Sequence, residues 1–206
     1  MARPGARLAP VAALGLLLGV VVALSMLPGG PVRLGGRHGE VAVGEARVGG
    51  PFELVDHTGS RVTDADFRGR ILLVFFGFSR SRDVTPAALQ VMAAATEMLG
   101  AEGDRVALLL VTVDPEHDTP ERLAAFRRSF HPRLVGLTGS AAEIRAIAKA
   151  YHVHIRREAG AAPPDDATLE HTTLVYLMDQ TGRYVDHFPH VSPAREIAAA
   201  IGRLLR

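Results

Sequence analysis

The sequence contains no cysteine among its 206 residues, and this absence excludes chemistry that depends on sulfur. A thiolate is the nucleophile of disulfide exchange and the soft donor that binds Cu(I). The hydroxyl groups of serine and threonine do not replace it at neutral pH. We therefore expect that the chain is not an enzyme of the thiol oxidoreductase class.

The chain also lacks a strong excess of charge of either sign. Its 23 basic and 22 acidic residues leave a formal net charge of +1. Such a balance produces no large field that would steer nucleic acid toward the protein. Nucleic acid is therefore excluded as an expected partner.

A long uncharged segment is present near the N-terminus, at residues 8–27. About twenty apolar residues match the thickness of the hydrocarbon core of a bilayer. We predict a single transmembrane anchor in the cytoplasmic membrane, with residues 1–7, which include Arg3 and Arg7, on the cytoplasmic side. A cleaved signal peptide is the alternative, since Ala23-Leu24-Ser25 resembles a cleavage site. Both interpretations place the folded part in the periplasm or outside the cell.

The rest of the chain divides into a tether and one domain. Residues 28–48 are rich in glycine and proline and contain too little apolar surface to form a core. Residues 49–206 are enough for a single domain with a sizeable core.

Strand and helix patterns alternate through this domain. Buried strands are predicted at residues 71–76, 106–113 and 134–138, and hairpins at 52–63 and 172–188. Helices are predicted to begin at Thr85-Pro86, Thr119-Pro120, Ser140 and Ser192-Pro193, where capping residues precede apolar residues at helical spacing. This order predicts an α/β fold with a mixed central sheet and helices on both faces.

Four segments of the domain resemble the SCO/SenC family, in the family's order and spacing. They are GPFELVDHTG at 50–59, LVFFGFS at 73–79, VDPEHDTP at 113–120 and EHTTLVYLMD at 170–179. The resemblance implies a thioredoxin-like fold, a membrane anchor and a role in building the binuclear copper centre of cytochrome c oxidase. It also implies a cytochrome oxidase subunit, or another copper-handling protein, as the partner.

The resemblance further implies a copper site, which this sequence retains only in part. The two copper-binding cysteines of the family correspond here to Ser81 and Thr85, and its histidine corresponds to His171. Asp83 and Pro86 still match the family's loop. The expected copper site is therefore degenerate, with His171 as its one remaining candidate ligand.

The nine histidines offer a second way to hold a metal. His152 and His154 are expected on one face of a strand, and His187 and His190 near the end of the last hairpin. Imidazole suits Cu(II) and Zn²⁺, so these pairs and His171 are candidates for a histidine-only site. The alternative is that they are ordinary surface histidines and that His171 is held by hydrogen bonds.

Three further motifs have both a functional and an ordinary interpretation. The acidic segment 114–118 offers ligands for a hard cation or groups for acid–base chemistry, but its composition favours a strand-to-helix turn. Arg80 and Arg82 beside a helix start could bind an anion, although exposed arginines usually need no ligand. Ser81 and Asp83 with the later histidine have the residue types of a hydrolase triad, but no nucleophile elbow surrounds the serine.

Two functions from different classes remain. The first is a membrane-anchored accessory protein of cytochrome c oxidase assembly or copper handling, with a degenerate copper site. The alternative is a periplasmic binding or docking module without metal, which recognises a peptide, an anion or a subunit through residues 80–85.

Overall fold

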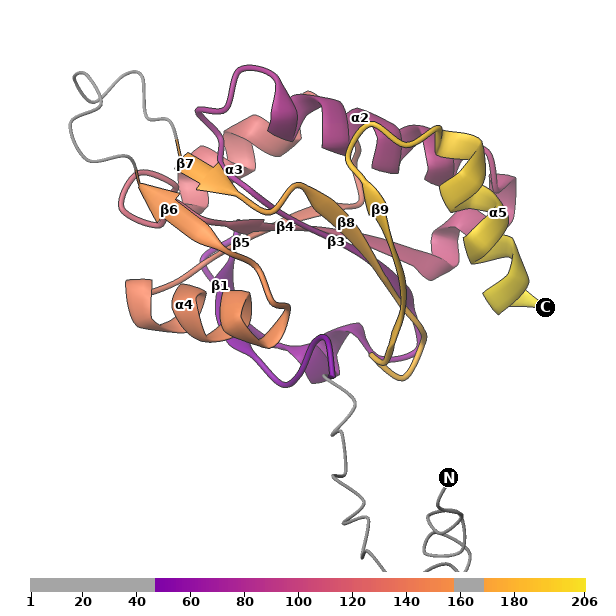
Figure 1. Cartoon of the computed structure of the whole chain (residues 1–206), viewed down its shortest axis with the longest axis horizontal. Coiled ribbons are helices and arrows are strands. Elements are labelled where there is room, and N and C mark those ends of the chain that lie inside the picture. Colours follow the sequence, from indigo (N-terminus) through magenta and orange to yellow (C-terminus); the bar gives the residue numbers. More distant parts are fainter. Residues whose placement is uncertain (1–46, 158–168) are drawn as a thin grey trace, which may run out of the picture. The chain divides into compact units, whose positions relative to one another are not determined.

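A mixed seven-stranded sheet forms the centre of the domain in the computed structural model, which describes residues 47–157 and 169–206 (Figure 1). Its order is β2-β1-β5-β4-β3-β8-β9. Strands β3, β4 and β5 are parallel, and every other pairing in this sheet is antiparallel. The strands are β1 (Glu53–Asp56), β2 (Arg61–Thr63), β3 (Ile71–Gly77), β4 (Val106–Thr112), β5 (Leu134–Thr138), β8 (Leu174–Met178) and β9 (Tyr184–Pro189). The three predicted buried strands and both predicted hairpins are thereby confirmed.

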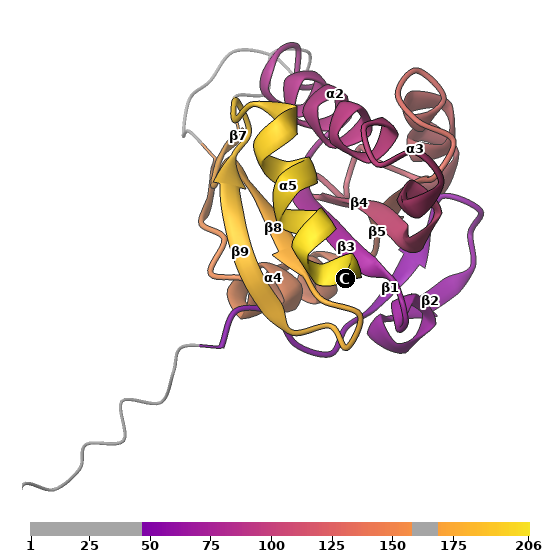
Figure 2. The same cartoon turned by 90° about the vertical axis from the view of Figure 1, so that its right-hand side faces the viewer.

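Helices cover both faces of this sheet, as the sequence predicts (Figures 1 and 2). Helices α2 (Val84–Glu97), α3 (Pro120–Arg127) and α5 (Ala194–Leu205) pack on one face, and α4 (Ala141–Ala150) packs on the other. Two 3₁₀ helices, η1 (Asp64–Phe67) and η2 (Gly100–Arg105), precede β3 and β4. A separate two-stranded sheet pairs β6 (Ile155–Arg157) with β7 (Leu169–His171).

The continuous apolar runs of β3 and β4 follow from burial on both faces. Along β3, Leu73 and Phe75 face the core under α2 and α5, whereas Leu72 and Val74 face the core beside α4. Side chains alternate between the two faces of a strand, so a central strand covered on both sides has no position for a polar residue.

The predicted helix starts are correct at two positions and wrong at two. The hydroxyl groups of Thr119 and Ser140 accept hydrogen bonds from the third residue that follows each of them, as caps should. Helix α2, however, begins after Asp83, whose carboxylate accepts a hydrogen bond from Val84 N at 2.7 Å, so Thr85 lies inside the helix. Helix α5 follows Pro193 and has no side-chain cap.

The predicted strand containing His152 and His154 is wrong, because the end of α4 occupies this position. Val153 N donates to Ala148 O and His152 N donates to Lys149 O, the pair of bonds that defines a Schellman motif. This places His152 in the left-handed region, with φ of 57°. Strand β6 begins only at Ile155, so the two histidines do not share a strand face.

The predicted anchor or signal peptide and nearly all of the predicted tether lie outside the described residues. Among the residues that the structure does describe, no helix has the length and apolar character needed to cross a membrane.

Candidate functional site

Two loops meet at one edge of the central sheet because the strands before them run in parallel and in register. Gly77, the last residue of β3, pairs with Thr112, the last residue of β4. The loop at 78–83 and the loop at 113–119 therefore leave the sheet side by side. The carboxyl edge of parallel strands is the usual place for a binding site in an α/β fold.

Asp118 joins these two loops to β4. Its carboxylate accepts a hydrogen bond from Ser79 N at 3.0 Å, a second from the Ser79 hydroxyl and a third from the Thr112 hydroxyl at 2.7 Å. Asp118 is fully buried, and these donors provide the partners that a buried carboxylate requires. The sequence predicts only that Asp118 belongs to a strand-to-helix turn, whereas the structure shows that it also holds the β3 loop in place.

Arg80 forms a second connection between the loops. Its Nη2 donates to Asp114 Oδ2 at 2.6 Å, and His117 Nδ1 lies 3.0 Å from both Arg80 Nη2 and Asp114 Oδ1. Burial of Asp114 raises its pKa, but the hydrogen bonds from Arg80 and His117 outweigh burial, so the pKa is lowered overall. Asp114 is therefore an anion at neutral pH, and an arginine neutralises it.

Ser81 and Thr85, which the resemblance aligns with the family's cysteines, join the β3 loop to the first turn of α2. Ser81 Oγ accepts a hydrogen bond from Thr85 N at 3.1 Å, and Thr85 Oγ1 accepts one from Phe78 N at 3.2 Å. Thr85 is completely buried, and a Cβ atom built on Gly77 would lie 2.6 Å from its hydroxyl oxygen. Both side chains therefore stabilise the loop and the helix start.

His171 ends β7 and lies next to the end of β3. Its ring packs edge-on against Phe75 and Phe78, with centroids 6.2 and 5.8 Å away. Nδ1 lies 2.9 Å from Leu169 O. When Nδ1 donates its proton to this carbonyl, the lone pair of the neutral ring is on Nε2. Nε2 is buried and has no hydrogen-bond partner in the described part of the chain. Burial, together with the nearby His190, lowers the pKa of His171 despite the Leu169 bond, so the ring is neutral at pH 7.

These residues do not fit the Cu(I) site that the resemblance implies. A neutral imidazole nitrogen without a partner suits a metal ion. The other two positions present hydroxyl oxygens, which are hard donors already engaged in hydrogen bonds, whereas Cu(I) prefers thiolate and thioether ligands. In the described part of the chain, no hydrogen bond joins His171 to Ser81 or Thr85, so the triad of Ser81, Asp83 and His171 is not assembled there.

The other histidines provide little support for a histidine-only site. His187 Nδ1 lies 2.6 Å from the Tyr184 hydroxyl, and His190 N donates to Thr173 O at 3.0 Å. His152 and His154 are exposed.

One group of potential metal ligands is found in the described residues, where ligand atoms of Asp114, Glu116 and His117 lie within 4.8 Å of one another. Because the Arg80 guanidinium already pairs with Asp114, the ordinary interpretation of segment 114–118 as a structured turn agrees with the geometry.

Sequence reasoning missed that Ser79, Arg80, Asp114 and Asp118 form one network. The sequence did contain a sign of this network. The acidic segment 114–118 directly follows the predicted strand 106–113, which is the next strand after 71–76. Consecutive parallel strands are usually neighbours, and neighbours end at the same edge of the sheet. The specific pairing of Arg80 with Asp114 depends on the register of β3 and β4, which the sequence does not specify.

Comparisons with known proteins agree with this geometry. A sequence profile described as SCO1/SenC matches residues 41–206. The chain is similar to the protein SenC of Rhodobacter capsulatus, with 34% identity over 203 residues, which is 97% of this chain and 90% of SenC. It is also similar to the structure of Bradyrhizobium japonicum ScoI with copper bound, with a TM-score of 0.70, 37% identity and coverage of 76% of this chain and 99% of that one. The predicted thioredoxin-like fold is thereby confirmed.

Eukaryotic relatives match over a shorter part of their length. The protein sco1 of Schizosaccharomyces pombe is 39% identical over 162 residues, which is 78% of this chain and 62% of the relative. The human mitochondrial SCO1 homolog is 37% identical over 169 residues, 80% of this chain and 55% of the relative. The chain thus spans less than two thirds of these relatives.

Proposed function

Since the chain belongs to the SCO1/SenC family, we propose that it is an accessory protein of cytochrome c oxidase assembly or copper handling whose copper site is degenerate. The observation that carries this proposal is the use of Ser81 and Thr85. The hydroxyl groups at the two positions that the resemblance assigns to cysteines accept hydrogen bonds between the β3 loop and the first turn of α2. The protein acts by docking and not by catalysis.

The proposal includes the location and the partner. Residues 8–27 anchor the chain in the cytoplasmic membrane, residues 28–48 connect the anchor to the domain, and the domain at 49–206 faces the periplasm. The partner is a cytochrome oxidase subunit or another copper-handling protein. The copper-bound relative from Bradyrhizobium japonicum supports this choice of partner class.

His171 is the one residue proposed as a metal ligand. Its neutral Nε2 could donate to a copper ion presented by a partner, but a single imidazole does not hold Cu(I) against cellular thiols. Copper is therefore bound only weakly by this chain. The proposed function does not require that the chain transfer copper on its own.

Copper titration of the full chain tests the degenerate site. We expect no stoichiometric Cu(I) binding by the wild type in competition with a chromophoric chelator. The double variant Ser81→Cys/Thr85→Cys should bind one Cu(I) per chain, because the loop that carries these positions is retained. Adding His171→Ala should weaken that binding. Retention of one Cu(I) by the wild type against the chelator would refute the proposal.

Deletion of the chain tests its biological role. We expect lower copper content and lower activity of the terminal oxidase, both restored by the wild type and by His171→Ala. Restoration by the wild type alone would show that copper ligation by His171 is required. An unchanged oxidase would exclude a role in its assembly.

The second proposal is a docking module without metal. The hydrogen bonds between the loop at 78–83 and the loop at 113–119 favour it. Arg80 and Ser79 are fixed by Asp114 and Asp118, so the loop presents a defined surface without any ion. A partner captured equally well by the wild type and His171→Ala, with copper absent, would support this alternative.

A further inference from the structure

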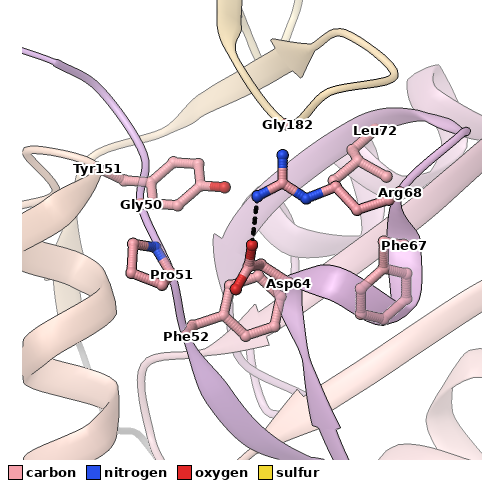
Figure 3. A pocket seen from close by; sticks show the side chains of 9 residues that line it. All are labelled: Gly50, Pro51, Phe52, Asp64, Phe67, Arg68, Leu72, Tyr151 and Gly182. Atoms are coloured by element: carbon pink, nitrogen blue, oxygen red, sulfur yellow. Dashed lines mark hydrogen bonds and ion pairs between the residues drawn. The ribbon is translucent and has the colours of Figure 1, made fainter.

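A hollow lies at the opposite end of β3 from the candidate site, between η1, the end of α4 and the β8–β9 turn (Figure 3). Its volume is about 300 Å³, within the range of small-molecule sites. The walls are mainly apolar and are formed by Pro51, Phe52, Phe67, Leu72 and Tyr151. It therefore offers space for an apolar group of modest size.

A wider basic hollow of about 620 Å³ adjoins it and shares Gly50, Arg68 and Gly182 with it. Arg47, Arg68 and Arg183 line this outer space, and no acidic side chain is among the described residues that line it. Among the described residues that line the inner hollow, Asp64 is the one with a carboxylate. The two spaces together combine an apolar interior with a positively charged entrance.

Arg68 lines both spaces, and its side chain is 50% exposed. Its Nη2 pairs with Asp64 Oδ2 at 2.5 Å, and a Cβ atom built on Gly182 would lie 2.9 Å from its Nη1. The guanidinium therefore packs directly on the backbone of the β8–β9 turn. Because Asp64 engages Nη2, other donors of the planar group remain for a second acceptor.

Tyr151 supplies a polar group to the inner hollow. Its side chain is 3% exposed, and its ring is held by Phe76 and Tyr176 at centroid distances of 5.3 and 5.4 Å. In Figure 3 the hydroxyl points across the hollow toward Arg68, and it makes no hydrogen bond within the described residues. Burial raises the pKa of Tyr151 to about 12, so the hydroxyl retains its proton and can donate.

We propose that this hollow binds a small amphiphilic carboxylate, whose apolar part enters between Phe52, Phe67 and Leu72 and whose carboxylate meets Arg68 and the Tyr151 hydroxyl. A guanidinium recognises a planar carboxylate with paired hydrogen bonds, and a tyrosine hydroxyl adds a third. A fully apolar ligand would leave the Tyr151 hydroxyl without an acceptor, and an inorganic anion would leave the apolar walls empty. The acid comes either from solution or from a membrane.

Titrations of the full chain, followed by NMR shifts or calorimetry, test this proposal. Hexanoate should bind, whereas acetate and 1-hexanol, which each carry half of its chemistry, should bind at least about tenfold more weakly. Phosphatidylcholine vesicles with and without oleate distinguish the source, since oleate-dependent binding that Arg68→Gln weakens, without binding of free hexanoate, assigns the acid to the membrane. Absence of binding to both would overturn the proposal.

Three variants connect binding to the residues. Arg68→Gln should weaken hexanoate binding about tenfold, and Tyr151→Phe, which preserves the ring, by roughly threefold to tenfold. Arg195→Gln on α5 is the matched control, since Arg195 is exposed and lies outside both hollows. Equal losses in Arg195→Gln would indicate non-specific attraction and contradict the proposal. Urea unfolding of each variant checks that it retains the fold.

Discussion

At the scale of single residues, Ser81 and Thr85 show how two hydroxyl groups stabilise a loop and the helix that follows it. Thr85 is buried beneath Gly77 and accepts the hydrogen bond of Phe78 N. Ser81 accepts the hydrogen bond of Thr85 N. Both hydroxyl oxygens stabilise the helix start, but as hard donors they suit Cu(I) less well than a thiolate does.

Thr85→Val should destabilise the domain by about 1–3 kcal/mol, because Phe78 N would be left buried without an acceptor. Valine has nearly the shape of threonine, so the loss isolates the hydroxyl group. Thr85→Ser is the matched control and should retain the hydrogen bond. Urea unfolding measures both variants, and equal stability of Thr85→Val and the wild type would contradict this account.

His171 should make stability depend on pH. Burial lowers its pKa in the folded protein below 6.5, the value expected of the unfolded chain. Between the lowered pKa and 6.5 the unfolded state binds more protons, so this contribution is present above pH 6.5 and is lost as the pH falls. His171→Gln should therefore lose less stability than the wild type between about pH 7.5 and pH 5.

Urea unfolding across that pH range measures the effect. The same substitution at exposed His154 is the control. If His154→Gln changed the pH dependence as much as His171→Gln, the effect could not be assigned to burial of the ring beside Phe75 and Phe78.

At the scale of elements, the ends of the helices account for the local errors of sequence reasoning. The sequence Ser81-Arg82-Asp83-Val84-Thr85 contains three residues that can cap a helix, and the structure uses Asp83. Similarly, His152 follows α4 as the left-handed residue of a Schellman motif, a position that glycine usually occupies. Both outcomes depend on where the chain must turn to reach the next strand.

His152→Gly should stabilise the domain by roughly 1 kcal/mol. Glycine removes the penalty of a left-handed backbone, which exceeds the entropy that glycine adds to the unfolded chain. His152→Val should be destabilising, since a branched side chain is least tolerated there. Thermal and urea unfolding measure both variants, and a loss of stability in His152→Gly would show that the histidine side chain itself is needed.

At the scale of the whole molecule, one sheet separates two cores and both depend on it. Leu108 and Leu109 are adjacent in β4, and each is 1% exposed. Leu108 packs in the core under α2 and α5, and Leu109 packs in the core beside α4. Because the same strand serves both cores, they should unfold together.

Leu108→Ala and Leu109→Ala should each cost about 2–5 kcal/mol. Each variant should still unfold in a single transition, with coincident curves from fluorescence and circular dichroism. Two separate transitions in either variant would show that the cores are independent units.

The sequence by itself determined the layers of this protein and the absence of cysteine thiols. The period and the length of an apolar run distinguish a strand buried on both faces, such as 71–76, from an amphipathic helix. The absence of cysteine is read directly from the sequence. Tertiary structure alone decided the pairing of Arg80 with Asp114, the burial of Asp118 and the hollow around Arg68 and Tyr151. These features join residues distant in sequence, and their positions depend on strand register and chain reversal, which local patterns do not encode.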